Sequence, residues 1–173
     1  EWRNTPIVIG ESDPEGCAAC GVSHYPQNGY RNGTMFPTYT ALQIARTYEL
    51  ADRRKVNLLG AVTWAFLFEG QPSFDGFRDL ATNGIDKPVL NFFRMAAMMK
   101  GRRVAVSSTG NIALDDIIAK GVREGANVDG LATTDTRQAA VMLWNYQDAE
   151  RGGLSAPVTA NIKGVPKNVS RVR

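Results

Sequence analysis

The sequence predicts an α/β region over residues 1–101, built from strand and helix units, followed by an all-β, sandwich-like module over residues 102–173. Two observations predict the α/β region: short, nearly continuous apolar runs occur at two places, and an amphipathic helical stripe follows each of them. A third observation marks the change of module, because apolar and polar residues alternate from residue 102 onward. We therefore place the domain boundary at Gly101.

The first unit begins with a β-branched run at residues 7–9, which is typical of a strand buried on both faces, as in parallel sheets. Glu11 follows at the C-terminal end of this strand. Residues 12–34 form a loop rich in Gly, Pro, Asn and Ser, longer than most connections between a strand and a helix. A helix is predicted over about residues 35–54 from its broad apolar stripe.

The second unit begins with the apolar run at residues 58–66, which we interpret as another buried strand. After a Gly-rich loop, Asp86 is predicted to cap a helix that has Pro88 in its first turn and Gly101 as its C-terminal cap. Two consecutive units of this kind favour a parallel α/β sheet or a (β/α)8 barrel. Either fold requires further strands to pair the sheet edges.

The β module is predicted from period-two alternation at three places. Val104 and Val106 alternate with polar neighbours, and residues 138–146 and 158–162 show the same pattern. Residues 110–126 between them are compatible with a short helix or with a long irregular crossing.

Composition excludes several classes of partner. The 173 residues are 43% hydrophobic and carry a net charge of +3, but the basic residues are scattered rather than gathered in a stripe, so we do not expect nucleic acid as a partner. No run approaches the roughly 20 apolar residues that span a bilayer, and residues 1–6 do not resemble a signal peptide. Since the chain opens without Met and enters a strand almost at once, we expect a piece of a longer protein. Its compartment and oligomeric state stay open.

Glu11 is the first candidate for chemistry, because catalytic side chains in α/β barrels gather at the C-terminal ends of the strands. A carboxylate fixed there can act as a nucleophile, a general acid or base, or a metal ligand. The alternative is a structural glutamate paired with a basic neighbour.

Aromatic residues crowd the end of the second strand, where Trp64, Phe66 and Phe68 precede Glu69. Such residues beside a carboxylate suit a sugar, whose ring presents apolar C–H faces surrounded by hydroxyl groups. The alternative is that Trp64 and Phe66 belong to a barrel core and Glu69 is solvated.

Cys17, Cys20 and His24 form a Cys-x2-Cys-x3-His pattern that fits three zinc ligands, with Asp13 or Glu15 as a fourth. A redox pair of cysteines is a second interpretation. Because no second cluster accompanies them, ordinary thiols in a loop are our default, and we predict no metal site and no cofactor.

Five sequence blocks follow one another in order along the chain: Pro6-Ile-Val-Ile-Gly-Glu-Ser-Asp-Pro-Glu-Gly16, Arg31-Asn-Gly-Thr34, Leu59-Gly-Ala-Val-Thr-Trp-Ala-Phe66, Phe68-Glu69 and Ala81-Thr-Asn-Gly-Ile-Asp-Lys-Pro-Val-Leu-Asn91. Together they resemble glycoside hydrolase family 39, the β-xylosidase family. The resemblance covers roughly residues 6–107, and the remainder more loosely resembles the β-sandwich appendage of that family.

The resemblance implies the C-terminal portion of a (β/α)8 TIM barrel, with its seventh and eighth strands, followed by an all-β sandwich-like module. It also implies a retaining hydrolase in which Glu11 is the nucleophile, Trp64 lies under the sugar, and Glu69 and Phe68 contact the substrate. The family's acid/base is a Glu in an Asn-Glu pair, and this chain contains no such dipeptide. The expected partner is a xylo-oligosaccharide or aryl β-xyloside, and we expect the segment alone to be inactive.

Three alternatives remain open at the level of sequence. Another sugar specificity on the same scaffold, such as arabinoside cleavage, would keep Glu11 as the nucleophile. A non-catalytic carbohydrate-binding module would keep the aromatic residues but tolerate the loss of Glu11. A zinc-stabilised interaction domain would bind metal.

Overall fold

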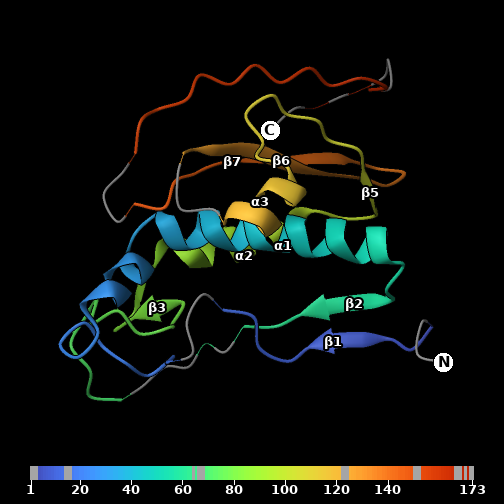
Figure 1. The fold of residues 1–173 in the computed structure, drawn as a ribbon. Helices are drawn as coiled ribbons and strands as arrows, with labels where there is room; N and C mark the ends of the chain where they lie inside the picture. The colour runs from blue at the N-terminus through green and yellow to red at the C-terminus, as the bar shows by residue number, and fades with distance from the viewer. Residues whose placement is uncertain are drawn as a thin grey trace.

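The computed structural model describes residues 4–13, 17–63, 65, 69–121, 125–149, 153–165, 169 and 171. The long helix α1 (Met35–Arg54) runs through the middle of the molecule and has a different sheet on each side (Figure 1). A three-stranded antiparallel sheet lies on one side, formed by β5 (Arg102–Val104), β6 (Asn127–Thr134) and β7 (Ala139–Tyr146). A pair of parallel strands lies on the other, formed by β1 (Ile7–Ile9) and β2 (Leu58–Ala61).

The parallel pair is built as one strand, helix, strand unit, because α1 connects β1 to β2. The predicted strand at residues 7–9 and the predicted helix at residues 35–54 are confirmed. The second strand is shorter than the predicted 58–66 and ends at Ala61, since β1 offers only three residues to pair with.

The prediction that these strands are buried on both faces is wrong. Ile7 is 43% exposed, Val8 58% and Leu59 64%. Among the described residues the pair has no third strand at either edge, and the other sheet lies beyond α1 (Figure 1). Apolar side chains of both strands are therefore left in contact with solvent.

A hairpin of β3 (Ala81–Thr82) and β4 (Ile85–Asp86) interrupts the segment that the sequence suggested to be a plain loop. Its two-residue turn is Asn83-Gly84, and both residues have positive φ, 46° and 82°. This is the turn chemistry that joins two tightly paired antiparallel strands.

Helix α2 (Pro88–Met98) begins and ends at residues other than those predicted. Asp86 is not its cap, because it belongs to β4 and pairs with Arg94 at 2.5 Å, while Lys87 occupies the N-cap position. Gly101 is not the C-terminal cap either, since Met99 holds that position. Gly101 instead has φ 83° and passes so close to Thr134 that a side chain would collide with the backbone there.

The antiparallel sheet confirms the predicted strand at residues 138–146 as β7, although Val106 lies outside β5. Helix α3 (Leu114–Lys120) is the short helix considered for residues 110–126. The strand predicted at residues 158–162 is not formed, because this segment has no ladder partner in the described part of the chain.

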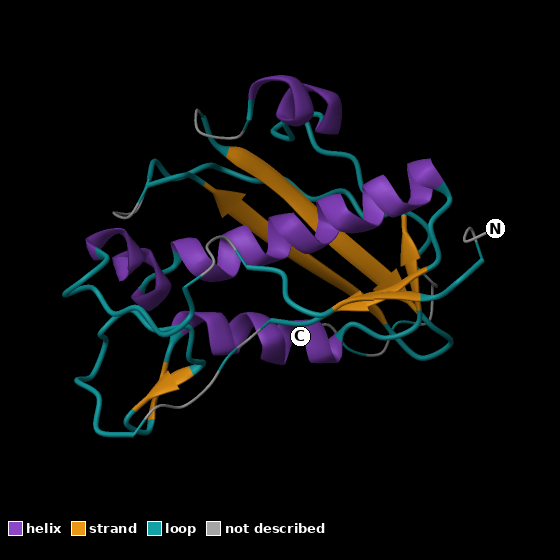
Figure 2. Cartoon of the chain, turned by 60° about the horizontal axis from the view of Figure 1, so that its bottom comes forward, coloured by secondary structure: helices purple, strands orange, loops and turns teal. Residues whose placement is uncertain are grey.

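The main core joins α1, α2 and β7, whose packing is also visible in Figure 2. Its buried members are Ala41, Leu42, Phe92, Met142, Trp144 and Tyr146. These residues come from both sides of Gly101, so the two predicted parts pack directly on one another. The described residues include no closed barrel and no second sheet facing β5, β6 and β7, so the barrel and the sandwich stay predictions. None of the helices in these ranges is long and apolar enough to span a bilayer.

Candidate functional site

Glu11 lies just beyond β1, at the edge where both parallel strands end. Backbone pairing continues past the strands on either side of it, because Val62 N donates to Ile9 O and Ser12 N donates to Val62 O, both at 3.0 Å. The structure therefore holds Glu11 where the sequence predicted it, at the C-terminal end of a strand.

The Glu11 carboxylate is held at one oxygen only. Its side chain is 47% exposed, and Oε1 accepts a hydrogen bond of 2.7 Å from Arg78 Nη1. No other described side chain or backbone group bonds this carboxylate. A structural glutamate forms the same kind of ion pair, so the pair alone does not distinguish a structural from a chemical role.

Arg78 is shared between two carboxylates. Its side chain is 1% exposed, and the same Nη1 that contacts Glu11 also donates to Asp13 Oδ2. Asp13, whose side chain is 3% exposed, accepts at Oδ1 from the hydroxyl of Thr63, beyond the end of β2. A buried charge is tolerated when it is paired and hydrogen-bonded, as Arg78 and Asp13 are. The arrangement ties together the ends of β1 and β2.

A second buried ion pair fixes the backbone on both sides of Arg78. Lys87 Nζ donates to Asp79 Oδ1 at 2.5 Å and to the carbonyl oxygen of Phe77 at 2.8 Å. Burial lowers the pKa of Lys87, and its bond to Asp79 opposes that shift. The residues before and after Arg78 are thus both held by one buried amine.

The long loop after Glu11 also supports Arg78. The buried side chain of Arg31 donates from Nη1 to the carbonyl oxygens of Cys17 at 3.0 Å and Gly76 at 3.2 Å. The backbone N–H of Arg78 donates to the carbonyl oxygen of Ala18 at 3.1 Å. The loop and the segment that carries Arg78 are therefore joined through backbone groups.

Cys17 and Cys20 form a disulfide within this loop, with their Cα atoms 5.4 Å apart. The default prediction of two ordinary thiols is wrong. In the disulfide neither sulfur is a thiolate that could bind zinc, and His24 instead contacts the hydroxyl of the adjacent Ser23. The ranges that the structure describes hold no group of three metal-binding side chains, and Glu15 lies outside them.

A small cavity adjoins this site, and its lining includes Asp13, Gln43, Thr63 and Arg78 together with apolar residues. Its volume of about 20 Å³ is enough for one water molecule, which needs about 10–15 Å³. A sugar ring does not fit in it. This cavity is therefore not a site for a sugar.

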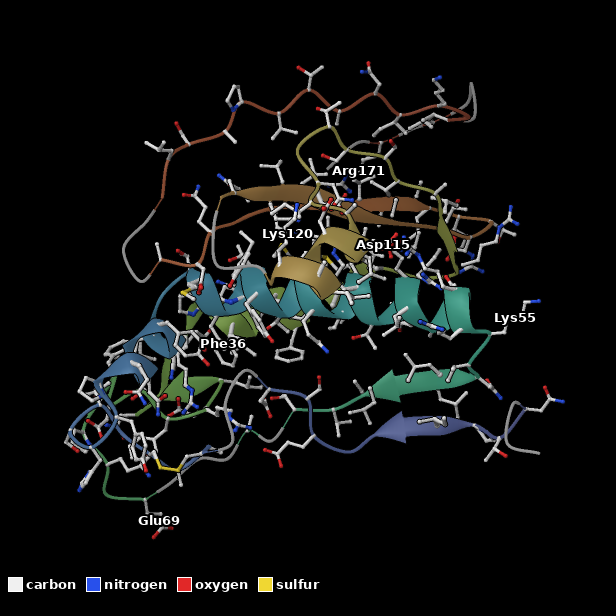
Figure 3. The ribbon with its side chains drawn as sticks, in the orientation of Figure 1. Phe36, Lys55, Glu69, Asp115, Lys120 and Arg171 are labelled. Atoms are coloured by element: carbon white, nitrogen blue, oxygen red, sulfur yellow. A yellow bond between two sulfur atoms is a disulfide. The ribbon has the colours of Figure 1, made fainter. Side chains whose placement is uncertain are left out.

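The other predicted site residues are not joined to Glu11 by described contacts. Glu69 is exposed in a turn, and in Figure 3 its side chain points away from the rest of the molecule. It forms no hydrogen bond or ion pair with any described residue. Trp64 and Phe68 lie outside the described residues.

Two residues of the site were missed by sequence reasoning. The sequence pattern indicates Asp13 only as a zinc ligand and indicates no role for Arg78, because 67 positions separate Arg78 from Glu11. The one local hint of Arg78 is its place in the sequence Phe77-Arg78-Asp79, within a Gly-rich segment. A charged residue beside an aromatic one is compatible with a buried ion pair, but this pattern does not show which carboxylate Arg78 would bind.

In comparisons with known proteins, no protein family, no curated protein and no solved structure matches this chain. The resemblance to the β-xylosidase family thus rests on the sequence blocks alone.

Proposed function

We propose that this chain is the C-terminal part of a retaining glycoside hydrolase that acts on β-xylosides, and that Glu11 is its nucleophile. The observation that carries the proposal is the state of the Glu11 carboxylate: it lies at the end of a parallel strand, is 47% exposed, and is anchored through Oε1 by a buried arginine. Ends of parallel strands are where α/β barrels place their reacting groups.

The uncovered strands give this proposal further support. A two-stranded parallel sheet with exposed apolar residues is not stable by itself, because parallel sheets are normally covered on both faces. Additional strands of a parent barrel would pair the free edges of β1 and β2 and cover Ile7, Val8 and Leu59.

In the proposed reaction, a Glu11 oxygen attacks the anomeric carbon of the xyloside while the bond to the leaving oxygen breaks. The leaving oxygen takes a proton from a second carboxylic acid, which in retaining enzymes lies about 5–5.5 Å from the nucleophile. Water then attacks the same carbon while the deprotonated acid takes its proton, and the ester bond breaks, which releases the sugar and restores both the Glu11 carboxylate and the acid. The acid would come from the parent protein, since the Asn-Glu pair of the family does not occur in these 173 residues.

The resemblance implies Trp64, Phe68 and Glu69 as substrate contacts. Of these three only Glu69 is described, and a contact with the sugar would require its side chain to turn inward from the position shown in Figure 3. The half-exposed side chain of Glu11 supports a substrate position on its outer side. No metal or cofactor takes part in this proposal.

Replacing Glu11 by Gln in the full-length protein tests the function. With an aryl β-xyloside as substrate, we expect the kcat of this variant to fall by about 10⁴-fold. The matched control is Glu49→Gln, which removes a carboxylate of α1 that pairs with Arg46 and Arg53 and touches no residue of the site. Equal activity of both variants would refute the assignment of Glu11 as the nucleophile.

The same assay separates the alternatives. A carbohydrate-binding module would show no turnover and would keep its sugar binding in the Glu11→Gln variant. An arabinoside-cleaving enzyme would prefer an aryl α-arabinoside to the β-xyloside while still depending on Glu11. The 173-residue segment alone is expected to show no turnover. Detectable hydrolysis by this segment would contradict the proposal that the general acid lies elsewhere in the parent protein.

A further inference from the structure

The Glu11 carboxylate depends on one side chain that comes from a distant part of the chain. Arg78 is the only described residue that bonds it, at 2.7 Å between Nη1 and Oε1. Glu11 is about half exposed, whereas the side chain of Arg78 is 1% exposed. The rigid partner in this pair is therefore the arginine.

The position of Arg78 is itself over-determined. Asp13 bonds the same guanidinium nitrogen and is in turn held by the hydroxyl of Thr63. The backbone N–H of Arg78 is held by the carbonyl oxygen of Ala18. Lys87 binds Phe77 and Asp79, the residues on each side. A buried guanidinium that is bonded to Asp13 and carried on a segment held at three consecutive residues has little freedom to follow a moving carboxylate.

A nucleophilic carboxylate needs one oxygen directed at the anomeric carbon, and reaction rates fall by about 100-fold when the reacting groups are misplaced by 1 Å. Anchoring Oε1 limits rotation of the carboxylate and leaves the other oxygen to attack. We propose that Arg78 is a positioning residue that orients Glu11 for attack, and that Asp13 holds Arg78 in place. This inference rests on the proposed function.

The test uses the full-length protein and 2,4-dinitrophenyl 2-deoxy-2-fluoro-β-xyloside. A Glu11 oxygen bonds to the anomeric carbon while dinitrophenolate leaves with the electron pair of the broken C–O bond. Dinitrophenolate needs no proton to leave, so the reaction reports on the nucleophile without the acid, and the fluorine slows hydrolysis of the ester. Mass spectrometry of the peptide that contains Glu11 gives the rate of labelling.

We expect Arg78→Met to slow labelling about 100-fold and to lower kcat for an aryl β-xyloside by a similar factor. KM should change by less than about threefold, because Arg78 holds the nucleophile and not the sugar. Arg78→Lys keeps the charge but not the guanidinium geometry, so it should restore only part of the rate. The control Arg94→Met, which removes an exposed partner of Asp86, should label at the wild-type rate.

Because Arg78→Met removes the cation beside the buried Asp13 carboxylate, the double variant Arg78→Met/Asp13→Asn provides a second measurement that separates positioning from misfolding. It removes both charges of the buried pair and is expected to keep the circular dichroism spectrum of the wild type while still labelling slowly. Labelling of a folded double variant at the wild-type rate would overturn the positioning role and leave the nucleophile intact. A wild-type protein that is not labelled at Glu11 would overturn both.

Discussion

The buried pair of Lys87 and Asp79 gives the most direct test of the packing beneath the candidate site. Substituting Lys87 by Met removes the amine, whose side chain is 1% exposed, and leaves Asp79, 10% exposed, without its cation. Breaking a buried ion pair on one side costs about 3–5 kcal/mol, because the remaining charge has lost its compensation. For a domain of this size that corresponds to a fall in Tm of about 6–20 °C.

Thermal and urea unfolding, followed by circular dichroism, measure this loss. The matched control is Arg94→Met, which breaks an exposed pair with Asp86 and should cost at most about 1 kcal/mol. The double variant Lys87→Met/Asp79→Asn leaves no uncompensated charge, so it should recover at least half of the loss. If Lys87→Met is no more destabilising than the control, the assignment of a buried, tightly coupled pair is wrong.

The pH dependence provides an independent check on the same pair. Because burial lowers the pKa of Lys87, the folded protein releases this proton at a lower pH than the unfolded chain does. Between that lowered value and the ordinary 10.5, the unfolded chain binds more protons, so the stability of the wild type rises with pH relative to the double variant. A difference in stability that is constant over this range would contradict the shift.

Two further predictions concern other parts of the fold. Burial raises the pKa of Asp129, so its ionised form weakens the folded state as pH rises from the ordinary 3.8 through the raised value. Asp129→Asn should therefore equal the wild type in strongly acidic urea titrations and exceed it at pH 7, and equal stability at both pH values would exclude the shift. Reduction of the Cys17–Cys20 disulfide opens a short loop and should cost about 2 kcal/mol in the urea midpoint analysis. A Cys17→Ser/Cys20→Ser variant should unfold identically with and without dithiothreitol, and an unchanged wild type after reduction would contradict the estimate.

The elements that can be predicted from the sequence are those in which apolar residues recur at the spacing of a helix or a strand. Helix α1 and strand β7 each present a regular apolar face, so the pattern alone locates them. Strand β6 was not predicted, because its inward positions include the polar Asn127, Asp129 and Thr133. Its ladder with β7 makes it a strand. Gly130, which argues against a strand locally, is needed because a side chain there would meet Leu143 and the backbone of Met142.

Other differences arise from signals that were present but outweighed. The Asn83-Gly84 pair is a strong hairpin signal, yet the Gly-rich surroundings and the Pro at position 88 favoured a loop followed by a capped helix. The candidate site likewise has one residue that the sequence predicts and one that it does not. Glu11 was predictable from its place after a strand, whereas Arg78 reaches it only through the tertiary fold, and no local pattern encodes that encounter.

Helix α1 has a consequence for any attempt to treat this chain as two modules. One side of the helix buries Leu42 against Trp144 and its neighbours in the main core, while Gln43 donates to the hydroxyl of Ser12, next to Glu11, at 2.6 Å. Helix α1 therefore contacts both the main core and the segment that carries Glu11. A chain shortened at residue 101 would leave that face of α1 exposed to water, so we expect the sheet of β5, β6 and β7 and the segment before residue 101 to fold as one unit.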